Sequence, residues 1–256
     1  MLDPDDLSPV LTSRDQAASP FLLLGDHAGR AIPRGLGGLG LAPGAMDGHI
    51  AWDIGVEGLG ERLSASLDAC FLRQTYSRLV IDCNRRPGAP GSIPAVSDGV
   101  AIPGNAALSA AEIRARTEEI YTPYQGAIAA MIEARKARGQ PTVLLALHSF
   151  TPVMQGIPRP WRYGVLHRND SPASRALLGL LRQTLGDQAG DNQPYALDET
   201  DNTIPLHAAA NGLDYVELEV RQDLIEGPAG QDEAAALIGC LLPQVWAALT
   251  DGPADR

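Results

Sequence analysis

Short apolar runs alternate along this chain with longer segments in which apolar residues recur every three to four positions. The apolar runs are expected strands, and the periodic segments are expected helices. The expected strands are residues 21–24, 71–72 with 76–81, 142–147, 163–166 and 215–220, and the expected helices are 52–67, 109–138, a segment ending near 185, and 231–249. Continuously apolar strands are typical of parallel sheets covered on both faces. The alternation therefore predicts an α/β fold with a mostly parallel central sheet and helices on both faces.

The chain has 256 residues, which suits one α/β domain or two small domains. No internal repeat or low-complexity segment divides it, so we predict a single domain over residues 19–250. Residues 1–18 are polar, and we expect them to form a loose tail. Residues 86–105 are rich in proline and glycine, and a long loop of this kind inside a compact domain is usually functional.

The formal net charge is -11, whereas proteins that bind nucleic acids present basic faces. The three cysteines form no CxxC pair, which favours a reducing compartment. The first residues lack the basic and apolar regions of a secretion signal, and no apolar run approaches the roughly 20 residues of a membrane span. We therefore expect a cytoplasmic protein with neither nucleic-acid nor membrane partners.

Polar residues follow four of the expected strands. These are His27, residues 82–85, His148 and residues 167–170, and Glu219 lies near the end of a fifth strand. Ligands of open α/β sheets bind outside the carboxyl ends of the strands. The sequence therefore predicts an active site where these residues converge.

The converging residues include the side chains of a hydrolytic zinc site. Such a site needs about three His, Asp or Glu ligands and an open position for water. His27 and His148 at strand ends and Asp53 at an expected helix start can supply them, with His49 as an alternative third ligand. No HExxH motif is present, which argues against a zincin.

A hydrolase of this kind also needs a general base and groups that bind an anion. Strand alternation puts Glu217 and Glu219 on one face, and either carboxylate can serve as the base. Arg78, Asn84 and Arg85 flank the expected strand at 76–81, and their donors can hold a carboxylate and polarise a carbonyl.

Six segments, in order, resemble the N-formylglutamate amidohydrolase family. They are GDHAGRAIP (25–33), HIAWDIG (49–55), YSRLVIDCNRRP (76–87), ALHSFTPV (146–153), DNTIPLH (201–207) and VELEVRQDLI (216–225). The resemblance extends from about residue 21 to residue 248.

The resemblance implies a phosphorylase/hydrolase-like three-layer sandwich, similar to zinc carboxypeptidases and aspartoacylases, and a zinc-dependent amidase. The activity that names the family cleaves N-formyl-L-glutamate to formate and glutamate in histidine degradation. The implied roles are Zn²⁺ binding by His27, Asp53 and His148, general-base catalysis by Glu219, carbonyl polarisation by Arg78, and substrate binding by Asn84, Arg85 and His207.

Two departures from the family pattern leave the acyl group and the amino acid open. Residues 26–29 read Asp-His-Ala-Gly where Pro-His-Ser-Gly is common, and Arg30 replaces the glutamate of the wider superfamily's His-x-x-Glu motif. Two other functions are consistent with the same residues. One is a carboxypeptidase-like peptidase, and the other is a protein that binds small carboxylates without catalysis.

Overall fold

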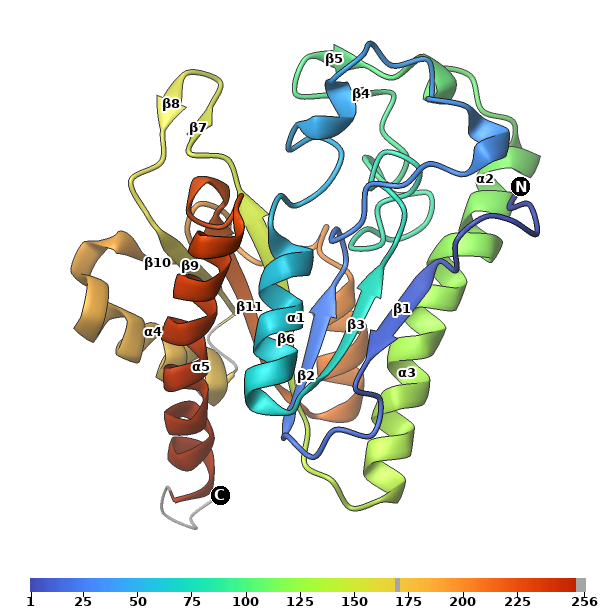
Figure 1. Cartoon of the computed structure of the whole chain (residues 1–256). Helices are drawn as coiled ribbons and strands as arrows, with labels where there is room; N and C mark the ends of the chain where they lie inside the picture. Colours follow the sequence, from blue (N-terminus) through green and yellow to red (C-terminus); the bar gives the residue numbers. More distant parts are fainter. Residues whose placement is uncertain (169–170, 252–256) are drawn as a thin grey trace.

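A seven-stranded sheet forms the centre of the computed structural model, which describes residues 1–168 and 171–251 (Figure 1). Its strands, in spatial order, are β1 (Val10–Ser13), β3 (Cys70–Gln74), β2 (Phe21–Gly25), β6 (Val143–Phe150), β11 (Asp214–Arg221), β9 (Tyr163–Leu166) and β10 (Ala189–Asp191). Strands β3, β2, β6 and β11 are parallel, whereas β1, β9 and β10 run in the opposite direction. The predicted mostly parallel sheet is confirmed.

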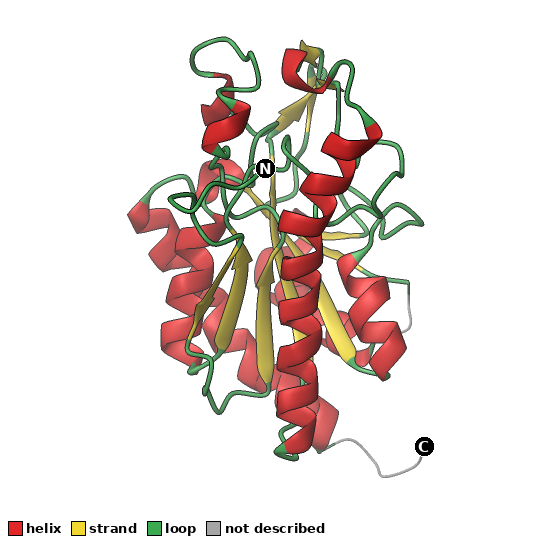
Figure 2. Ribbon diagram, turned by 90° about the vertical axis from the view of Figure 1, so that its right-hand side faces the viewer, coloured by secondary structure: helices red, strands yellow, loops and turns green. Residues whose placement is uncertain are grey.

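Helices cover both faces of this sheet (Figure 2). Helices α1 (Val56–Leu67), α4 (Pro172–Leu185) and α5 (Pro228–Thr250) share one face. On the other face, α2 (Ala110–Arg116) and α3 (Thr122–Ala137) are joined by the π-helical segment η4 (Thr117–Tyr121). The three-layer α/β architecture is therefore also confirmed.

The two cores explain why the strands are continuously apolar. Leu23 and Leu145 pack toward α1, α4 and α5, whereas their neighbours Leu22 and Leu144 pack toward α3, and all four are fully buried. Burying each such side chain contributes about 1.5–3 kcal/mol to stability. Both faces must therefore be apolar, which removes the alternation of a half-exposed strand.

The N-terminal segment differs from the expected loose tail. Residues 10–13 form β1, which pairs antiparallel with β3 at the edge of the sheet. An edge strand gains backbone hydrogen bonds on one side and needs little side-chain burial. The segment VLTS, with only two apolar residues, therefore forms a strand that the sequence analysis did not predict.

The expected strand at 76–81 is also wrong. Strand β3 ends at Gln74, Tyr76 forms only an isolated bridge with Ala31, and residues 78–80 form a turn. The amide of Arg78 and the hydroxyl of Ser77 both donate to the carbonyl oxygen of Ala51. This apolar run is buried as a loop because its backbone partners lie in another loop.

Helix α1 begins later than the expected start at residue 52. Its N-cap residue Gly55 has φ +84°, and a Cβ there would lie 2.0 Å from the carbonyl oxygen of Ile225. Asp53 consequently lies in the loop before the helix rather than in its first turn. Its amide donates to the carbonyl oxygen of His27 at 2.9 Å, which holds the two residues together.

Residues 167–170 were expected beside the other polar strand ends, and the structure contradicts this for His167 and Arg168. Strand β9 is antiparallel to β11, with Leu166 opposite Glu217, so β9 ends away from His148. His167 Nε2 instead lies 2.9 Å from Asp191 Oδ1. Asn169 and Asp170 lie outside the described residues.

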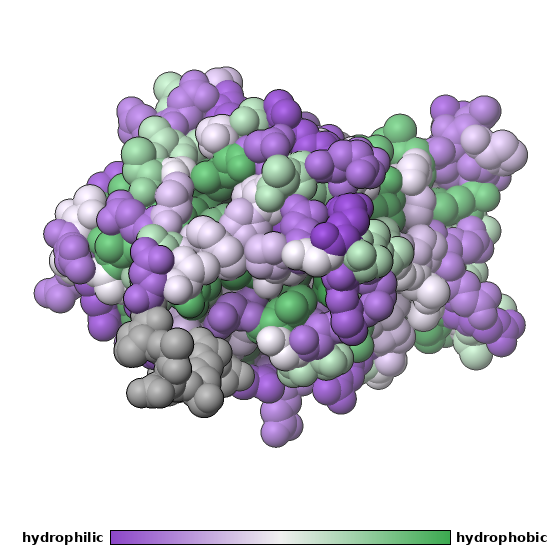
Figure 3. Space-filling model, turned by 90° about the horizontal axis from the view of Figure 1, so that it is seen from below, coloured by the Kyte–Doolittle hydropathy of each residue, from purple (hydrophilic) through white to green (hydrophobic). Residues whose placement is uncertain are grey.

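Loops gather at the carboxyl ends of the parallel strands, in the upper part of Figure 1. They include the hairpins β4–β5 (Val96–Ser97 and Val100–Ala101) and β7–β8 (Val153–Met154 and Ile157–Pro158). The opposite end shows hydrophilic and hydrophobic residues interspersed (Figure 3). Helix α5 is long and apolar enough to cross a membrane by length and composition, and in this fold it packs against α1 and α4.

Candidate metal centre and active site

A cavity of about 470 Å³ lies among these loops, at the carboxyl ends of the parallel strands. Its lining contains seven of the eight predicted site residues, namely His27, Asp53, Arg78, Asn84, Arg85, His148 and Glu219. The structure thus brings together side chains that are up to 192 positions apart in the sequence.

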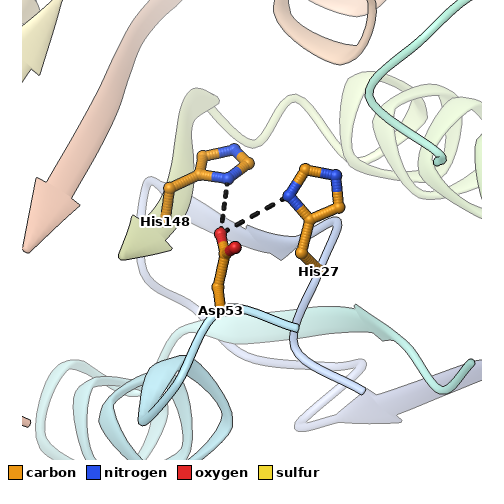
Figure 4. A group of neighbouring side chains, drawn as sticks. All are labelled: His27, Asp53 and His148. Carbon is orange, nitrogen blue, oxygen red and sulfur yellow. Dashed lines mark hydrogen bonds and ion pairs between the residues drawn. The ribbon is translucent and has the colours of Figure 1, made fainter. Parts of the chain in front are cut away.

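Three of these residues form a buried group that could hold a metal ion (Figure 4). His27 follows β2, His148 lies in β6, and Asp53 lies in the loop before α1. Asp53 Oδ2 is 2.9 Å from His148 Nδ1 and 3.4 Å from His27 Nδ1. One donor atom of each residue lies within 4.8 Å of the others. Donors on a tetrahedral zinc are separated by roughly 3.3 Å, so these residues fit the ion with small adjustments.

The outer nitrogen of each imidazole faces a further carboxylate. His27 Nε2 lies 2.7 Å from Asp82 Oδ1, and His148 Nε2 lies 3.6 Å from Asp26 Oδ2. His27 Nδ1 is buried and has no hydrogen-bond partner among the described residues. Metal-ligating histidines commonly bind a carboxylate through their other nitrogen, which fixes the ring and its tautomer. The donor set therefore fits a metal site.

The charges of this group are strongly coupled. Burial opposes ionisation of Asp53, but the charge of His27 and hydrogen bonding to His148 outweigh burial and hold the pKa of Asp53 well below its ordinary value. Burial likewise opposes protonation of His148, yet contacts with Asp26 and Asp53 raise its pKa well above the ordinary value. The group therefore attracts positive charge, whether protons or a metal cation.

Two buried glutamates lie beside it on β11. Glu219 pairs in register with His148, and Glu217 pairs with Ala146, so both carboxylates share the sheet face of His148. Burial raises the pKa of Glu219 to about 7, against the opposing charge of His148. Burial also raises the pKa of Glu217 to about 8. A carboxylate with a pKa near 7 is suited to general-base catalysis, and the register puts Glu219 closer to the metal group.

Arg78 connects the carboxylates around the metal group. Its Nη1 donates to Asp53 Oδ1 at 3.2 Å and its Nη2 donates to Asp82 Oδ2 at 2.9 Å. Its side chain keeps 28% of its surface exposed, on the cavity side. Arg78 therefore offsets two buried negative charges and still reaches the cavity.

Asn84 and Arg85 also line the cavity, but they bind the 198–203 segment. Asn84 Oδ1 accepts hydrogen bonds from the amides of Asn202 and Thr203, both at 2.9 Å. Arg85 Nη1 donates to Thr200 Oγ1 at 2.6 Å and to Asp201 Oδ1 at 3.2 Å. The amide of Asn84 is thus committed to the fold, whereas Arg85 could exchange Asp201 for a substrate carboxylate.

Two histidines lie elsewhere than the sequence suggested. His207, predicted to bind substrate, does not line the cavity and instead has Nε2 2.7 Å from Gln125 Oε1 inside the protein. It lies in the π-helical segment η6 (Pro205–Ala209), which turns the ring toward α3. His49, the alternative metal ligand, faces the cavity but pairs with Asp98 at 3.2 Å, and is not part of the metal group.

Sequence reasoning missed the two carboxylates that hold the imidazoles. Asp26 immediately precedes His27, and Asp82 immediately precedes the Cys-Asn-Arg segment. Both residues belong to the quoted family segments, but neither was assigned a role. It also gave no role to Tyr195, which lies outside the six family segments, or to Asp201, which opens the DNTIPLH segment, and both residues line the cavity. Only the strand register together with the loop paths shows which imidazole each carboxylate meets.

Comparisons with known proteins identify the family and the structural relatives of this chain. The sequence profile of the N-formylglutamate amidohydrolase family matches residues 19–226. The crystal structure of a gene product from Agrobacterium tumefaciens is 34% identical, with a TM-score of 0.94, over 97% of this chain and 99% of that chain. N-formylglutamate amidohydrolase from Ralstonia eutropha is 20% identical, with a TM-score of 0.67, over 96% of this chain and 100% of that chain, and shares the fold.

Among curated proteins, no sequence matches the chain significantly. The family profile nevertheless covers most of the chain, including every residue of the candidate site. The chain belongs to the N-formylglutamate amidohydrolase family.

Proposed function

We propose that this protein is a zinc-dependent amidohydrolase that removes a formyl or other small acyl group from an N-acyl amino acid. Membership of the family supports a hydrolase that acts on amide bonds. The observation that carries the proposal is the buried group of His27, Asp53 and His148, with Glu219 in register beside it. The amidohydrolase that names the family acts on N-formylglutamate, which is the first substrate to test.

His27, Asp53 and His148 would hold the metal, and Asp82 and Asp26 would fix the two imidazoles. Zinc held by these residues would lower the pKa of a bound water and polarise a carbonyl group. Arg78 reaches the same cavity with a positive charge, and so stabilises negative charge that develops on the carbonyl oxygen.

Glu219 carries the proton in this proposal. Its carboxylate accepts a proton from the attacking water while the oxygen of that water bonds to the acyl carbon. The bond between the acyl carbon and nitrogen then breaks, and Glu219 returns the proton to the leaving amine. The products are the carboxylic acid, formate for a formyl group, and the free amino acid.

The loop at 86–105 favours a small substrate over a peptide. Gly91, Pro94 and residues 96–98 of this loop line the cavity, so the loop and strand β4 form part of the cavity wall. A carboxypeptidase-like reaction would need room there for a polypeptide. The same residues therefore support deacylation of an amino acid better than peptide hydrolysis.

The test measures metal content and formate release together. We expect about one zinc per chain, loss of zinc in His148→Ala, and release of formate from N-formyl amino acids by the zinc-loaded protein. His49→Ala is the matched control, because His49 faces the cavity outside the metal group, and it should retain zinc. Zinc-loaded protein that hydrolyses no N-formyl or N-acyl amino acid would favour carboxylate binding without catalysis.

A further inference from the structure

We infer that the amino acid released in this cavity carries a cationic side chain, whose charged end binds Glu217. This inference rests on the proposed amidase function and names the substrate class of the same site. It differs from the reaction on N-formylglutamate, whose side chain is an anion.

The cavity is markedly acidic. The described residues that line it include two arginines, Arg78 and Arg85, and seven carboxylates, namely Asp53, Asp82, Asp98, Asp198, Asp201, Glu217 and Glu219. The excess is greatest when Glu217 and Glu219 are ionised, and the lining histidines or a bound divalent cation would offset only part of it. Like charges brought into a partly buried site repel strongly, so the lining disfavours a substrate with two carboxylates.

Most of these carboxylates already have partners. Asp53 and Asp82 contact the imidazoles and Arg78, and Asp201 pairs with Arg85. Asp98 pairs with His49, and Asp198 accepts hydrogen bonds from the amide and hydroxyl of Thr200. Glu217 and Glu219 therefore differ from the other five.

The carboxylate of Glu217 has no part in the proposed reaction. The residue is 2% exposed, and its buried Oε2 has no hydrogen-bond partner in residues 1–168 or 171–251. Such a buried carboxylate is costly to keep without compensation. Glu219 also lacks a partner, but the proposed reaction gives it a proton to transfer.

The position of Glu217 suits the end of a substrate side chain. It precedes Glu219 by two residues on β11, so it lies roughly 6.6 Å further from the carboxyl end of the strand. Leu166, which pairs with Glu217, supplies an apolar wall of the cavity at the same level. A flexible apolar stem that ends in a cation matches this surface.

Neither lining arginine is available to bind an acidic side chain of the substrate. Arg78 lies between Asp53 and Asp82, and Arg85 is the group free to exchange Asp201 for the α-carboxylate. The nearby Arg159 does not line the cavity and donates to Tyr195 Oη at 2.8 Å. A second carboxylate on the substrate would therefore meet the glutamates.

The experiment compares kcat/KM of the zinc-loaded enzyme for Nα-formyl-L-lysine, Nα-formyl-L-norleucine and N-formyl-L-glutamate. Lysine and norleucine side chains are similar in length and differ in charge. We expect the order lysine, norleucine, glutamate, and a lysine-to-norleucine ratio that falls at least about tenfold in Glu217→Gln, as for loss of one charge-assisted hydrogen bond. Asp98→Asn removes a paired cavity carboxylate and should leave the ratio unchanged.

The ratio is independent of the fraction of active enzyme, so partial misfolding of a variant does not disturb it. Fastest hydrolysis of N-formylglutamate, or an unchanged ratio in Glu217→Gln, would overturn the inference while leaving the amidase function intact. If neither the three substrates nor their N-acetyl analogues are hydrolysed, the amidase proposal fails instead. Calorimetry then decides the cation site: tighter binding of L-lysine than L-norleucine, lost in Glu217→Gln, supports it, and equal binding refutes it.

Discussion

Two imidazoles of the candidate metal centre are each held by a carboxylate outside the metal group. Asp82 lies 2.7 Å from His27, and Asp26 lies 3.6 Å from His148. Asp26 is itself held by the hydroxyls of Tyr124 and Thr203, at 2.7 and 3.0 Å. At the scale of single residues, the site is therefore a set of side chains whose orientations are fixed by their neighbours.

Asp82→Asn should weaken zinc binding by about 10–100-fold, because the amide orients His27 less strongly and withdraws a negative charge. The dissociation constant is measured by competition with a chelator. Asp98→Asn serves as the control, since its carboxylate lines the same cavity but pairs with His49. Equal affinities of Asp82→Asn and the unmodified protein would show that Asp82 does not position a ligand.

Glu219→Gln should lower kcat by about 100-fold or more, because an amide cannot accept the proton of water. Zinc content should be unchanged, since Glu219 lies outside the metal group. Steady-state kinetics with metal analysis on the same samples tests both. Retained activity in this variant, with loss in Glu217→Gln for all substrates alike, would transfer the role of base to Glu217.

The rate should also depend on the protonation of Glu219. Burial raises the pKa of Glu219 to about 7, and only the ionised carboxylate accepts a proton. We therefore expect kcat/KM to fall as the pH is lowered through the pKa of this group, with bound zinc moving the midpoint downward. The profile is measured with zinc in excess, and a rate that is constant from pH 8 to pH 5 would contradict the assignment.

At the scale of elements, loops rather than strands or helices bring some of the site residues into contact. Asp53 reaches His27 and His148 because α1 begins after Gly55, where the chain passes close to the carbonyl oxygen of Ile225. That contact connects the loop before α1 to the segment that enters α5. The position of this candidate metal ligand thus depends on one glycine.

Gly55→Ala should destabilise the protein by about 2 kcal/mol or more, since φ is +84° and the added Cβ meets backbone 2.0 Å away. Urea unfolding measures the change. Gly126→Ala is the control, because Gly126 is exposed in α3 with nothing near its Cβ position. That variant should be up to about 1 kcal/mol more stable.

At the scale of the whole molecule, folding collects negative charge in one cavity of a chain whose net charge is already -11. The apolar cores on the two faces of the sheet supply the stability that allows Glu217 and Glu219 to be buried without partners. Catalytic and binding sites often impose such a burden on a fold.

The free-energy cost of burying the ionised Glu217 should appear in the pH dependence of stability. Burial raises the pKa of Glu217 from 4.5 to about 8, so the folded state binds more protons than the unfolded state between these values. This group therefore makes the metal-free protein less stable as pH rises from 4.5 to 8. Glu217→Gln should remove that loss, so its stability relative to the unmodified protein should rise with pH in this window. Urea titrations at several pH values, in chelator, test the slope.

The sequence by itself determined the α/β class, most helices, and the identity of seven cavity residues. The spacing of apolar residues indicates which positions are buried, and polar residues after apolar runs indicate where the strands end. Both signals come from neighbouring residues in the sequence. The segments at 163–166 and 215–220 were also predicted as strands from the same signal.

Only the tertiary structure decided which residues meet. The direction of β9 places His167 and Arg168 away from the site, and the π-helical turn of η6 places His207 in the interior. The choice of Asp53 over His49, and the pairing of Asp26 and Asp82 with separate imidazoles, follow from strand register and loop paths. These contacts join residues that are far apart in the chain. The sequence around one residue therefore does not identify the residue that it contacts.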